Sequence, residues 1–149
     1  MNTSSLAAIA RTSSCREASA AQNDSMSSRS DALASFERAR VIWERELGLD
    51  DRNLAFALTG IGATYLAEGD AASALAPLER AFKIREAHEV DPARRADTRF
   101  ALARSLWETN RDRVRARALA EQAKEGYATS AAKPKVAEVD SWLRARGAS

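Results

Sequence analysis

The segment ALASFERARVIWERE, from Ala32 to Glu46, aligns without a gap with ALAPLERAFKIREAH, from Ala74 to His88. The offset is 42 residues, and a looser third copy, ARALAEQAKEGYATS, starts at Ala116 with the same offset. The identical pairs include Ala32/Ala74, Leu33/Leu75, Glu37/Glu79, Arg38/Arg80, Ala39/Ala81 and Ile42/Ile84. A fixed period of this kind is typical of a repeat protein, in which each supersecondary unit buries its apolar face against the next.

Each copy of this segment is predicted to form an amphipathic helix. The apolar positions of the first copy recur at steps of three or four residues and are Ala32, Phe36, Ala39 and Trp43. Asp31 is a candidate N-cap of this helix. Gly48 follows it at a place where a residue with a left-handed backbone commonly ends a helix.

The residues before each copy also repeat. Within LAFALTGIGATYLAEGD, which starts at Leu54, the part from Ala55 onward aligns at the same offset with DTRFALARSLWETNRD, which starts at Asp97. The alignment pairs Leu58 with Phe100, Ile61 with Ala103, Tyr65 with Trp107 and Asp70 with Asp112. We therefore predict that each repeat is a helix, a tight turn near Gly69 or Arg111, and a second helix.

Composition favours an all-α fold with one core. The 149 residues include 33 alanines and 13 leucines but only 5 valines and 4 isoleucines, which favours helices over a β-sheet. Residues 1–30 are rich in serine and are predicted to be disordered. The repeat domain is predicted at 31–129, with a half repeat at 31–47, a full repeat at 51–89 and a degenerate repeat at 93–129. A C-terminal capping helix is predicted at 132–147.

One motif carries a family resemblance. It consists of Ile61-Gly62-Ala63-Thr64-Tyr65, Gly69-Asp70, Ala74, Leu78 and Ala81, and it resembles the tetratricopeptide repeat. Gly62, Ala74 and Ala81 are small, so that two antiparallel helices can approach, while Tyr65 and Leu78 fill the space between them. The 42-residue period is similar to that of kinesin light chains, and the repeats are similar to the C-terminal tails of bacterial serine/threonine protein kinases. The resemblance implies a short right-handed α-solenoid that binds other proteins.

Two departures from the family pattern affect this prediction. Arg104 stands at the position of the repeat glycine and Arg111 at that of the turn glycine, so we interpret the last repeat as a degenerate terminal unit. The first repeat lacks an apolar helix within residues 13–29. Its remaining helix should therefore expose an apolar edge. The residues of this expected edge are Phe36, Ile42 and Trp43.

The resemblance also implies a peptide groove along the first helix of each pair. Its expected lining is Phe56, Thr59, Ala63, Leu66, Thr98, Ala101, Ser105 and Glu108. The lysines and asparagines with which some relatives hold the terminal carboxylate of a peptide are absent from these positions. The alternative interpretation is that these side chains are solvated or pack on a neighbouring helix.

The residue counts argue against a catalytic or metal-binding protein. One histidine, His88, and one cysteine, Cys15, exclude a Cys/His zinc site and a disulfide framework by number alone. Gly60-Ile61-Gly62 lacks the third glycine of a dinucleotide-binding loop. We therefore expect no catalytic residue, no cofactor and no metal.

The net charge of +2 is distributed unevenly. Residues 31–90 carry 7 basic and 11 acidic side chains, whereas residues 91–149 carry 13 basic and 8 acidic ones. Eight arginines lie from Arg94 to Arg117, but no aromatic residue is interleaved with them on the second helix, so nucleic-acid binding is not expected. No run of about 18 apolar residues occurs, and we expect a cytoplasmic protein without a membrane span.

Two functional hypotheses follow. The first is a non-catalytic adaptor that binds a protein or peptide in its groove, with its N-terminal half repeat covered by a partner or by a second copy in a homo-oligomer. The second is a C-terminal regulatory fragment of a bacterial serine/threonine protein kinase whose catalytic domain is absent from this chain. No glycine-rich nucleotide loop, HRD or DFG occurs in the sequence, so this chain lacks the motifs for phosphoryl transfer by that route.

Overall fold

The computed structural model describes residues 28–49 and 51–147, and these residues form helices without any strand. The first helix spans residues 28–47. It is followed by α2 (Arg52–Ala67), α3 (Ala71–His88), α4 (Pro92–Glu108), α5 (Arg113–Thr129) and α6 (Lys133–Gly147). The predicted all-α class is confirmed. None of the described helices is both long and apolar enough to cross a membrane.

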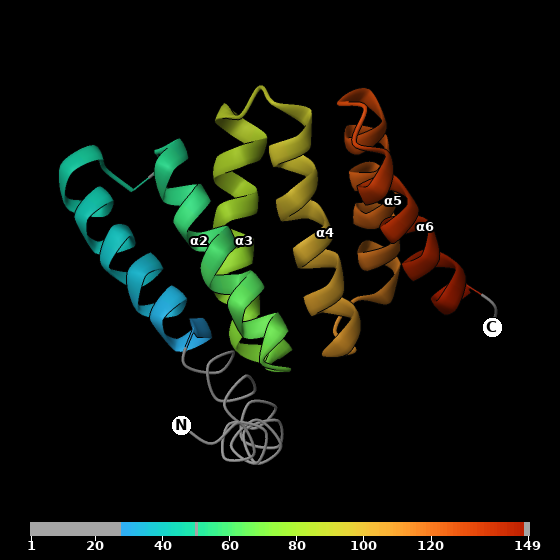
Figure 1. The fold of residues 1–149 in the computed structure, drawn as a ribbon, viewed down its shortest axis with the longest axis horizontal. Helices are drawn as coiled ribbons and strands as arrows, with labels where there is room; N and C mark the ends of the chain where they lie inside the picture. The colour runs from blue at the N-terminus through green and yellow to red at the C-terminus, as the bar shows by residue number, and fades with distance from the viewer. Residues whose placement is uncertain (1–27, 50, 148–149) are drawn as a thin grey trace, which may run out of the picture.

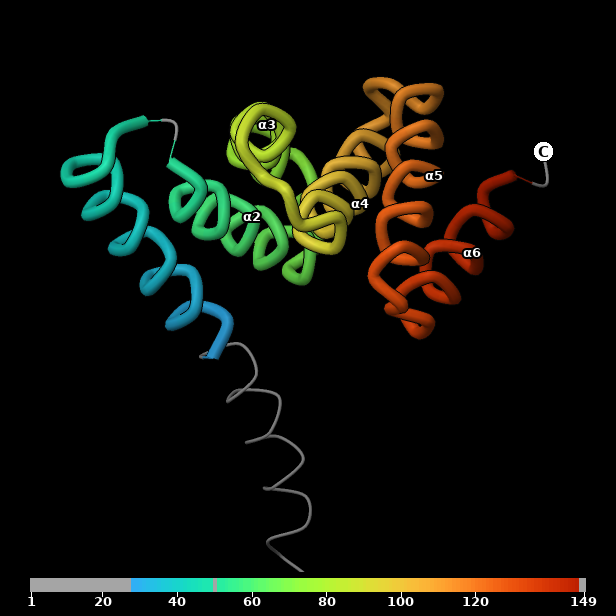
Figure 2. The backbone as a smooth tube through the Cα atoms, turned by 90° about the horizontal axis from the view of Figure 1, so that it is seen from above, coloured from blue at the N-terminus to red at the C-terminus, as the bar shows by residue number. Residues whose placement is uncertain are grey.

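The helices stand side by side in chain order, and successive helices run in opposite directions (Figure 1). Seen from above, α3 lies to one side of α2, and α4 and α5 slant across the depth of the stack (Figure 2). Each helix from α2 to α6 packs on its neighbour in sequence, and α2 also contacts α4. The molecule is therefore a short α-solenoid, in which the first helices of the pairs form one surface and the second helices form the other.

An aspartate starts each helix from α2 to α5. The carboxylate of Asp51, Asp70, Asp91 and Asp112 accepts a hydrogen bond from a backbone N–H of the first turn in each case. The N···O distances are 2.8, 3.0, 2.9 and 2.9 Å in that order. Such a cap satisfies an otherwise unpaired donor and places a negative charge at the positive end of the helix, which contributes about 1 kcal/mol each.

The closest approach in the first pair lies where α2 crosses α3. A Cβ at Gly62 would come within 2.3 Å of Leu78 Cγ, so only glycine fits against this leucine. Ala74 and Ala81 of α3 are also fully buried. The expected roles of Gly62, Ala74, Ala81 and Leu78 are thus confirmed, because large side chains at the small positions would hold the helices apart.

The turn between α4 and α5 is one residue longer than the turn between α2 and α3. Each turn contains one residue with a left-handed backbone, Gly69 (φ 82°) in the first and Asn110 (φ 54°) in the second. In both, the following N–H donates to a carbonyl five residues back, at 2.9 and 3.1 Å. The prediction that Arg111 takes the place of the turn glycine is therefore wrong, since Asn110 takes it.

This extra residue changes which positions are equivalent in the two repeats. With the turns superposed, Gly62 corresponds to Ala103 and not to Arg104. Ala103 is fully buried, whereas Arg104 is half-buried and faces the groove side of α4. The first helices therefore repeat at 41 residues, and only the second helices, from Asp70 and Asp112 onward, repeat at 42. The last repeat keeps a small residue at the helix crossing, which corrects its interpretation as degenerate there.

Ion pairs join the second helices along the outer surface. Glu44 of the 28–47 helix pairs with Arg80 of α3, and Glu79 of α3 pairs with Arg115 of α5. All four side chains remain partly exposed, so each pair stabilises the stack by about 1 kcal/mol or less. The apolar core carries the stability, and its largest cluster lies between α4, α5 and α6, where Trp142 packs edge-on against both Phe100 and Trp107.

The first described helix extends further toward the N-terminus than was predicted. Residues 28–30 already belong to the first helix, so Asp31 lies inside that helix and is not its N-cap. Gly48 follows the helix with φ 94°, as expected. The remainder of the segment predicted to be disordered, residues 1–27, lies outside the described residues.

Replacing Gly62 by Ala is expected to destabilise the protein by about 1–3 kcal/mol, because the added methyl group overlaps Leu78. In an exposed helix the same change would stabilise by up to about 1 kcal/mol. Chemical denaturation of both single variants and the Gly62→Ala/Leu78→Ala double variant measures the coupling. In the Leu78→Ala background the glycine replacement should be neutral or stabilising. If Gly62→Ala lowered the free energy of unfolding equally with Leu78 and with Leu78→Ala, the proposed overlap with Leu78 would be contradicted.

Replacing Asn110 by Gly is expected to raise the free energy of unfolding by up to about 1 kcal/mol, because glycine adopts a left-handed backbone without strain. Arg111→Gly is the matched control, and it should lower that free energy by about 0.5–1 kcal/mol through added chain entropy. Denaturant unfolding of both variants tests the corrected turn. If Arg111→Gly raised the free energy of unfolding and Asn110→Gly lowered it, the original alignment of Gly69 with Arg111 would be correct.

Candidate functional site

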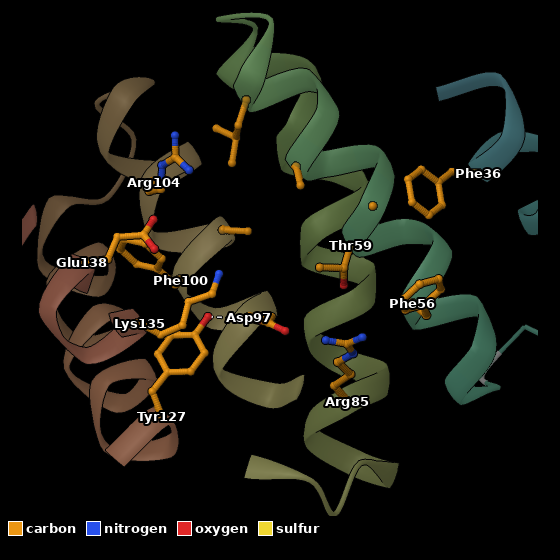
Figure 3. A pocket seen from close by; sticks show the side chains of 14 residues that line it. Phe36, Phe56, Thr59, Arg85, Asp97, Phe100, Arg104, Tyr127, Lys135 and Glu138 are labelled. Atoms are coloured by element: carbon orange, nitrogen blue, oxygen red, sulfur yellow. Dashed lines mark hydrogen bonds between the residues drawn. The ribbon is translucent and has the colours of Figure 1, made fainter. Parts of the chain in front are cut away.

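A groove opens along the surface formed by the first helices. Its cavity volume is about 320 Å³, and its walls come from the 28–47 helix, α2, α4, α5 and α6, with one residue of α3 at its floor. Figure 3 shows Phe36 and Phe56 on one side and Tyr127, Lys135 and Glu138 on the other. Residues from all six described helices therefore line this groove.

The wall on the α2 side is apolar. The Phe36 ring lies directly over Gly60, where a Cβ would come within 2.5 Å of it, so the glycine makes room for the ring. Phe36 also packs edge-on against Phe56 with 6.0 Å between ring centroids. Phe56 is still 56% exposed, and Ala63 and Leu66 continue the wall along α2. An exposed aromatic ring that is held in place by a second ring offers an apolar contact to a ligand.

The structure divides the predicted groove residues into two groups. Phe56, Thr59, Ala63, Leu66 and Ala101 line the cavity. Thr98 and Ser105 do not, since they are 1% and 0% exposed. Ser105 donates to the Ala71 carbonyl at 2.7 Å, and Glu108 pairs with Arg146 at 3.2 Å.

The one-residue difference between the two repeats explains this division. Thr98 and Ser105 were placed in the groove from their 42-residue offset to α2, but the first helices repeat at 41 residues. At the corrected offset the equivalents of Phe56, Thr59 and Ala63 are Asp97, Phe100 and Arg104. All three of these α4 residues line the cavity.

A chain of hydrogen bonds crosses the floor of the groove. Arg85 Nη1 of α3 donates to Thr98 Oγ1 of α4 at 2.9 Å, and the Thr98 and Thr59 hydroxyl oxygens are 2.9 Å apart. Thr59 in turn donates to the Ala55 carbonyl at 2.7 Å. Because Thr59 uses its proton on Ala55, Thr98 is the donor of the bond between the two hydroxyls. Each group in this series of hydrogen bonds therefore donates to the next one, from α3 through α4 to α2.

Arg85 is a buried cation. It is only 3% exposed, and burial lowers the pKa of its guanidinium from the ordinary value. Its Nη1 also donates to the Arg94 carbonyl, whereas its Nε–H has no partner in the part of the chain that is described. Figure 3 shows the guanidinium pointing toward Thr59, between Phe56 and Asp97.

The opposite wall is polar. Tyr127 of α5 donates from its hydroxyl to Asp97 Oδ1 at 2.6 Å, and burial together with this bond raises the pKa of Tyr127 above its ordinary value. Lys135 Nζ of α6 lies 5.9 Å from the centre of the Tyr127 ring. The tyrosine thus stays protonated and holds the Asp97 carboxylate in a fixed position at the groove.

Sequence reasoning missed the contributions of four helices to the groove, among them the 28–47 helix, whose Phe36 was assigned only to the exposed edge. Arg85 and Tyr127 occupy equivalent positions of the second helices, and both reach between the first helices. Lys135 and Glu138 come from α6, which was assigned only a capping role. The aligned pair Arg85/Tyr127 was the available signal, because each residue lies on a helix face that also carries buried alanines.

The expected edge of the first helix is exposed in part. Ile42 is 56% exposed, whereas Phe36 and Trp43 are half-buried. The large apolar residues exposed on and just after this helix are Val41, Ile42, Leu47 and Leu49. Association of two copies through this edge stays a prediction.

Comparison with known proteins agrees with this architecture. Residues 27–87 match the family model described as tetratricopeptide repeat, and they include the first helix, α2 and nearly all of α3. No curated protein and no solved structure matches the chain. The chain therefore contains a tetratricopeptide repeat, while the 42-residue class and the similarity to kinase tails stay predictions.

Thr98→Val is expected to lower the free energy of unfolding by about 1–3 kcal/mol, because it removes the acceptor of a buried charged donor, Arg85. Thr59→Val is the matched control. It leaves Thr98 able to accept from Arg85 and removes only the acceptor of a neutral O–H, so it should cost less than Thr98→Val. Denaturant unfolding of both variants measures the difference. A larger loss from Thr59→Val than from Thr98→Val would contradict the direction assigned to the chain.

Proposed function

We propose that this chain, with its tetratricopeptide repeat, is a non-catalytic scaffold that binds an extended segment of a partner protein in the groove of α2, α4 and α6. Repeats of this family generally mediate protein–protein interaction. The observation that carries the proposal is the exposed Phe56, which lies beside Ala63 and Leu66 on the apolar wall of the groove. In such a groove, contacts with the apolar wall provide the affinity for a peptide, and bonds to the fixed polar groups of the opposite wall set the position at which it binds.

The two walls have different roles in this proposal. Apolar side chains of the peptide pack against Phe56 and Ala63, because these two residues are the exposed part of the α2 wall. Backbone and polar groups of the peptide bond to the opposite wall, where Asp97, Arg104 and Lys135 offer both signs of charge. The Asp97 carboxylate is held by Tyr127, so little ordering entropy is lost there on binding.

The rigid floor supports the same proposal. Arg85, Thr98 and Thr59 tie α3, α4 and α2 together beneath the groove. Gly60 and the Phe36 ring fix the first helix against α2. A groove built on elements that are fixed in this way binds a peptide with little rearrangement of the backbone.

Ala63→Glu is expected to weaken peptide binding at least about tenfold, because it puts a charge on the apolar wall where the peptide would pack. The test uses the full chain to select binders from a random-peptide display library. Fluorescence anisotropy then gives the affinity of labelled selected peptides. Ala118→Glu is the matched control, since Ala118 is exposed on α5 and lies outside the groove lining, and it should change the affinity less than twofold.

The outcome is decisive when both variants fold. Circular dichroism and thermal unfolding establish the fold of each, and both substitutions are at exposed helix positions. Selected peptides that bind wild type and Ala63→Glu equally well would show that the groove is not the binding surface. Failure of a diverse library to yield any binder would contradict the proposal as a whole.

A further inference from the structure

We propose that Arg85 is an oxyanion-binding residue at the floor of the groove, where it recognises a carboxylate or phosphate group carried by the bound peptide. This inference rests on the proposed function and names the chemistry of the ligand. Arg85 is 3% exposed, yet it lines both the groove and an adjoining cavity of about 500 Å³ near the start of α2. Its side chain is therefore almost wholly enclosed by protein, and some of its atoms border a cavity on each of two sides.

The guanidinium has donors that the protein does not use. An arginine side chain carries five N–H groups in a fixed planar fork. The two on Nη1 are bonded to the Arg94 carbonyl and to Thr98 Oγ1. The Nε–H is buried without a partner among the described residues. A buried donor left unpaired is costly, and a charged one more so, which favours any ligand that supplies an acceptor.

No carboxylate within the described chain forms an ion pair with Arg85, although acidic residues stand nearby. Asp97 accepts from the Tyr127 hydroxyl at 2.6 Å. Glu89 accepts from the Asp91 N–H at 3.1 Å and lies 4.0 Å from Arg94. Asp51, which lines the adjoining cavity, accepts from the Asn53 N–H at 2.8 Å. Each of these carboxylates therefore has a partner of its own, and none neutralises the guanidinium directly.

The hydrogen-bond chain presents the guanidinium in a fixed orientation. Thr98 holds Nη1 from the α4 side and is itself held by Thr59, so the plane of the fork is set before a ligand arrives. A planar guanidinium presents two parallel donors to an oxyanion, which is the geometry that carboxylates and phosphates share. The equivalent residue of the next repeat is Tyr127, whose hydroxyl is already bonded to Asp97. Of these two equivalent positions, only Arg85 has free donors. The two ends of the groove therefore differ, so that a peptide would bind in one orientation.

The test observes the Arg85 Nε–Hε resonance in a ¹H–¹⁵N spectrum of the full-length protein during titration with sodium phosphate at constant ionic strength. A parallel titration uses sodium acetate. We expect a saturable shift of this resonance with at least one anion, because the oxyanion provides the missing acceptor. Saturation with acetate identifies a carboxylate ligand, and saturation with phosphate alone identifies a phosphorylated one. No shift, or a shift that grows linearly at every arginine, would overturn the proposal.

Variants give an independent reading of the same site. Arg85→Met keeps most of the side-chain volume. It should lower the affinity for the anion that gives a saturable shift at least about tenfold. The control Arg115→Met removes an arginine that is paired with Glu79 on the outer surface, and it should leave the affinity unchanged. The wild-type spectrum decides the matter even if Arg85→Met does not fold. Peptide binding that depends on Ala63 without any saturable anion effect would sustain the scaffold function and reject the oxyanion site.

Discussion

The guanidinium of Arg85 is the group on which the floor of the groove depends. It extends from α3 to Thr98 of α4, and the bond continues through Thr59 to the backbone of α2. A cation buried in this way is tolerated only while its acceptors stay in place, because an unpaired buried charge costs several times more than a neutral hydrogen bond contributes. The hydrogen bonds that join these three helices beneath the groove therefore begin at one buried side chain, while the apolar core carries the stability of the stack.

Much of the fold could be predicted from the sequence because the pattern of small and large residues repeats along the chain. Gly62 is small where Leu78 is large, and this complementarity identifies the crossing of two helices from the residue types alone. The exact register could not be predicted. One residue is added in the turn at Asn110, and an ungapped alignment absorbs such an insertion by pairing Gly62 with Arg104 in place of the adjacent Ala103. The structure reveals the insertion through the longer turn and the left-handed backbone at Asn110, a conformation that asparagine adopts more readily than most residues.

The candidate site was predictable to the extent that it lies on the first helices. The family resemblance places a groove along the first helices, and the helical period then selects Phe56 and Ala63 on α2. The same selection on α4 is wrong by one residue, and Thr98 and Ser105 lie in the interior. A shift of one position rotates a helix face by about 100°, so even a single inserted residue exchanges groove side chains for core side chains. The helical period of the first helices could not identify Arg85, since it lies on a second helix, where a polar residue is normally solvated; its alignment with Tyr127 was the one available signal.

The central claim is that the surface formed by the first helices binds the partner. The most direct measurement is a map of backbone amide shifts in the ¹⁵N-labelled full-length protein on addition of a peptide that the chain itself has selected. The account predicts that the largest shifts cluster at Phe56, Ala63, Phe100 and Arg104, which line the two sides of the groove. Shifts concentrated on the outer surface of α3 and α5, around the Glu79–Arg115 pair, would contradict it.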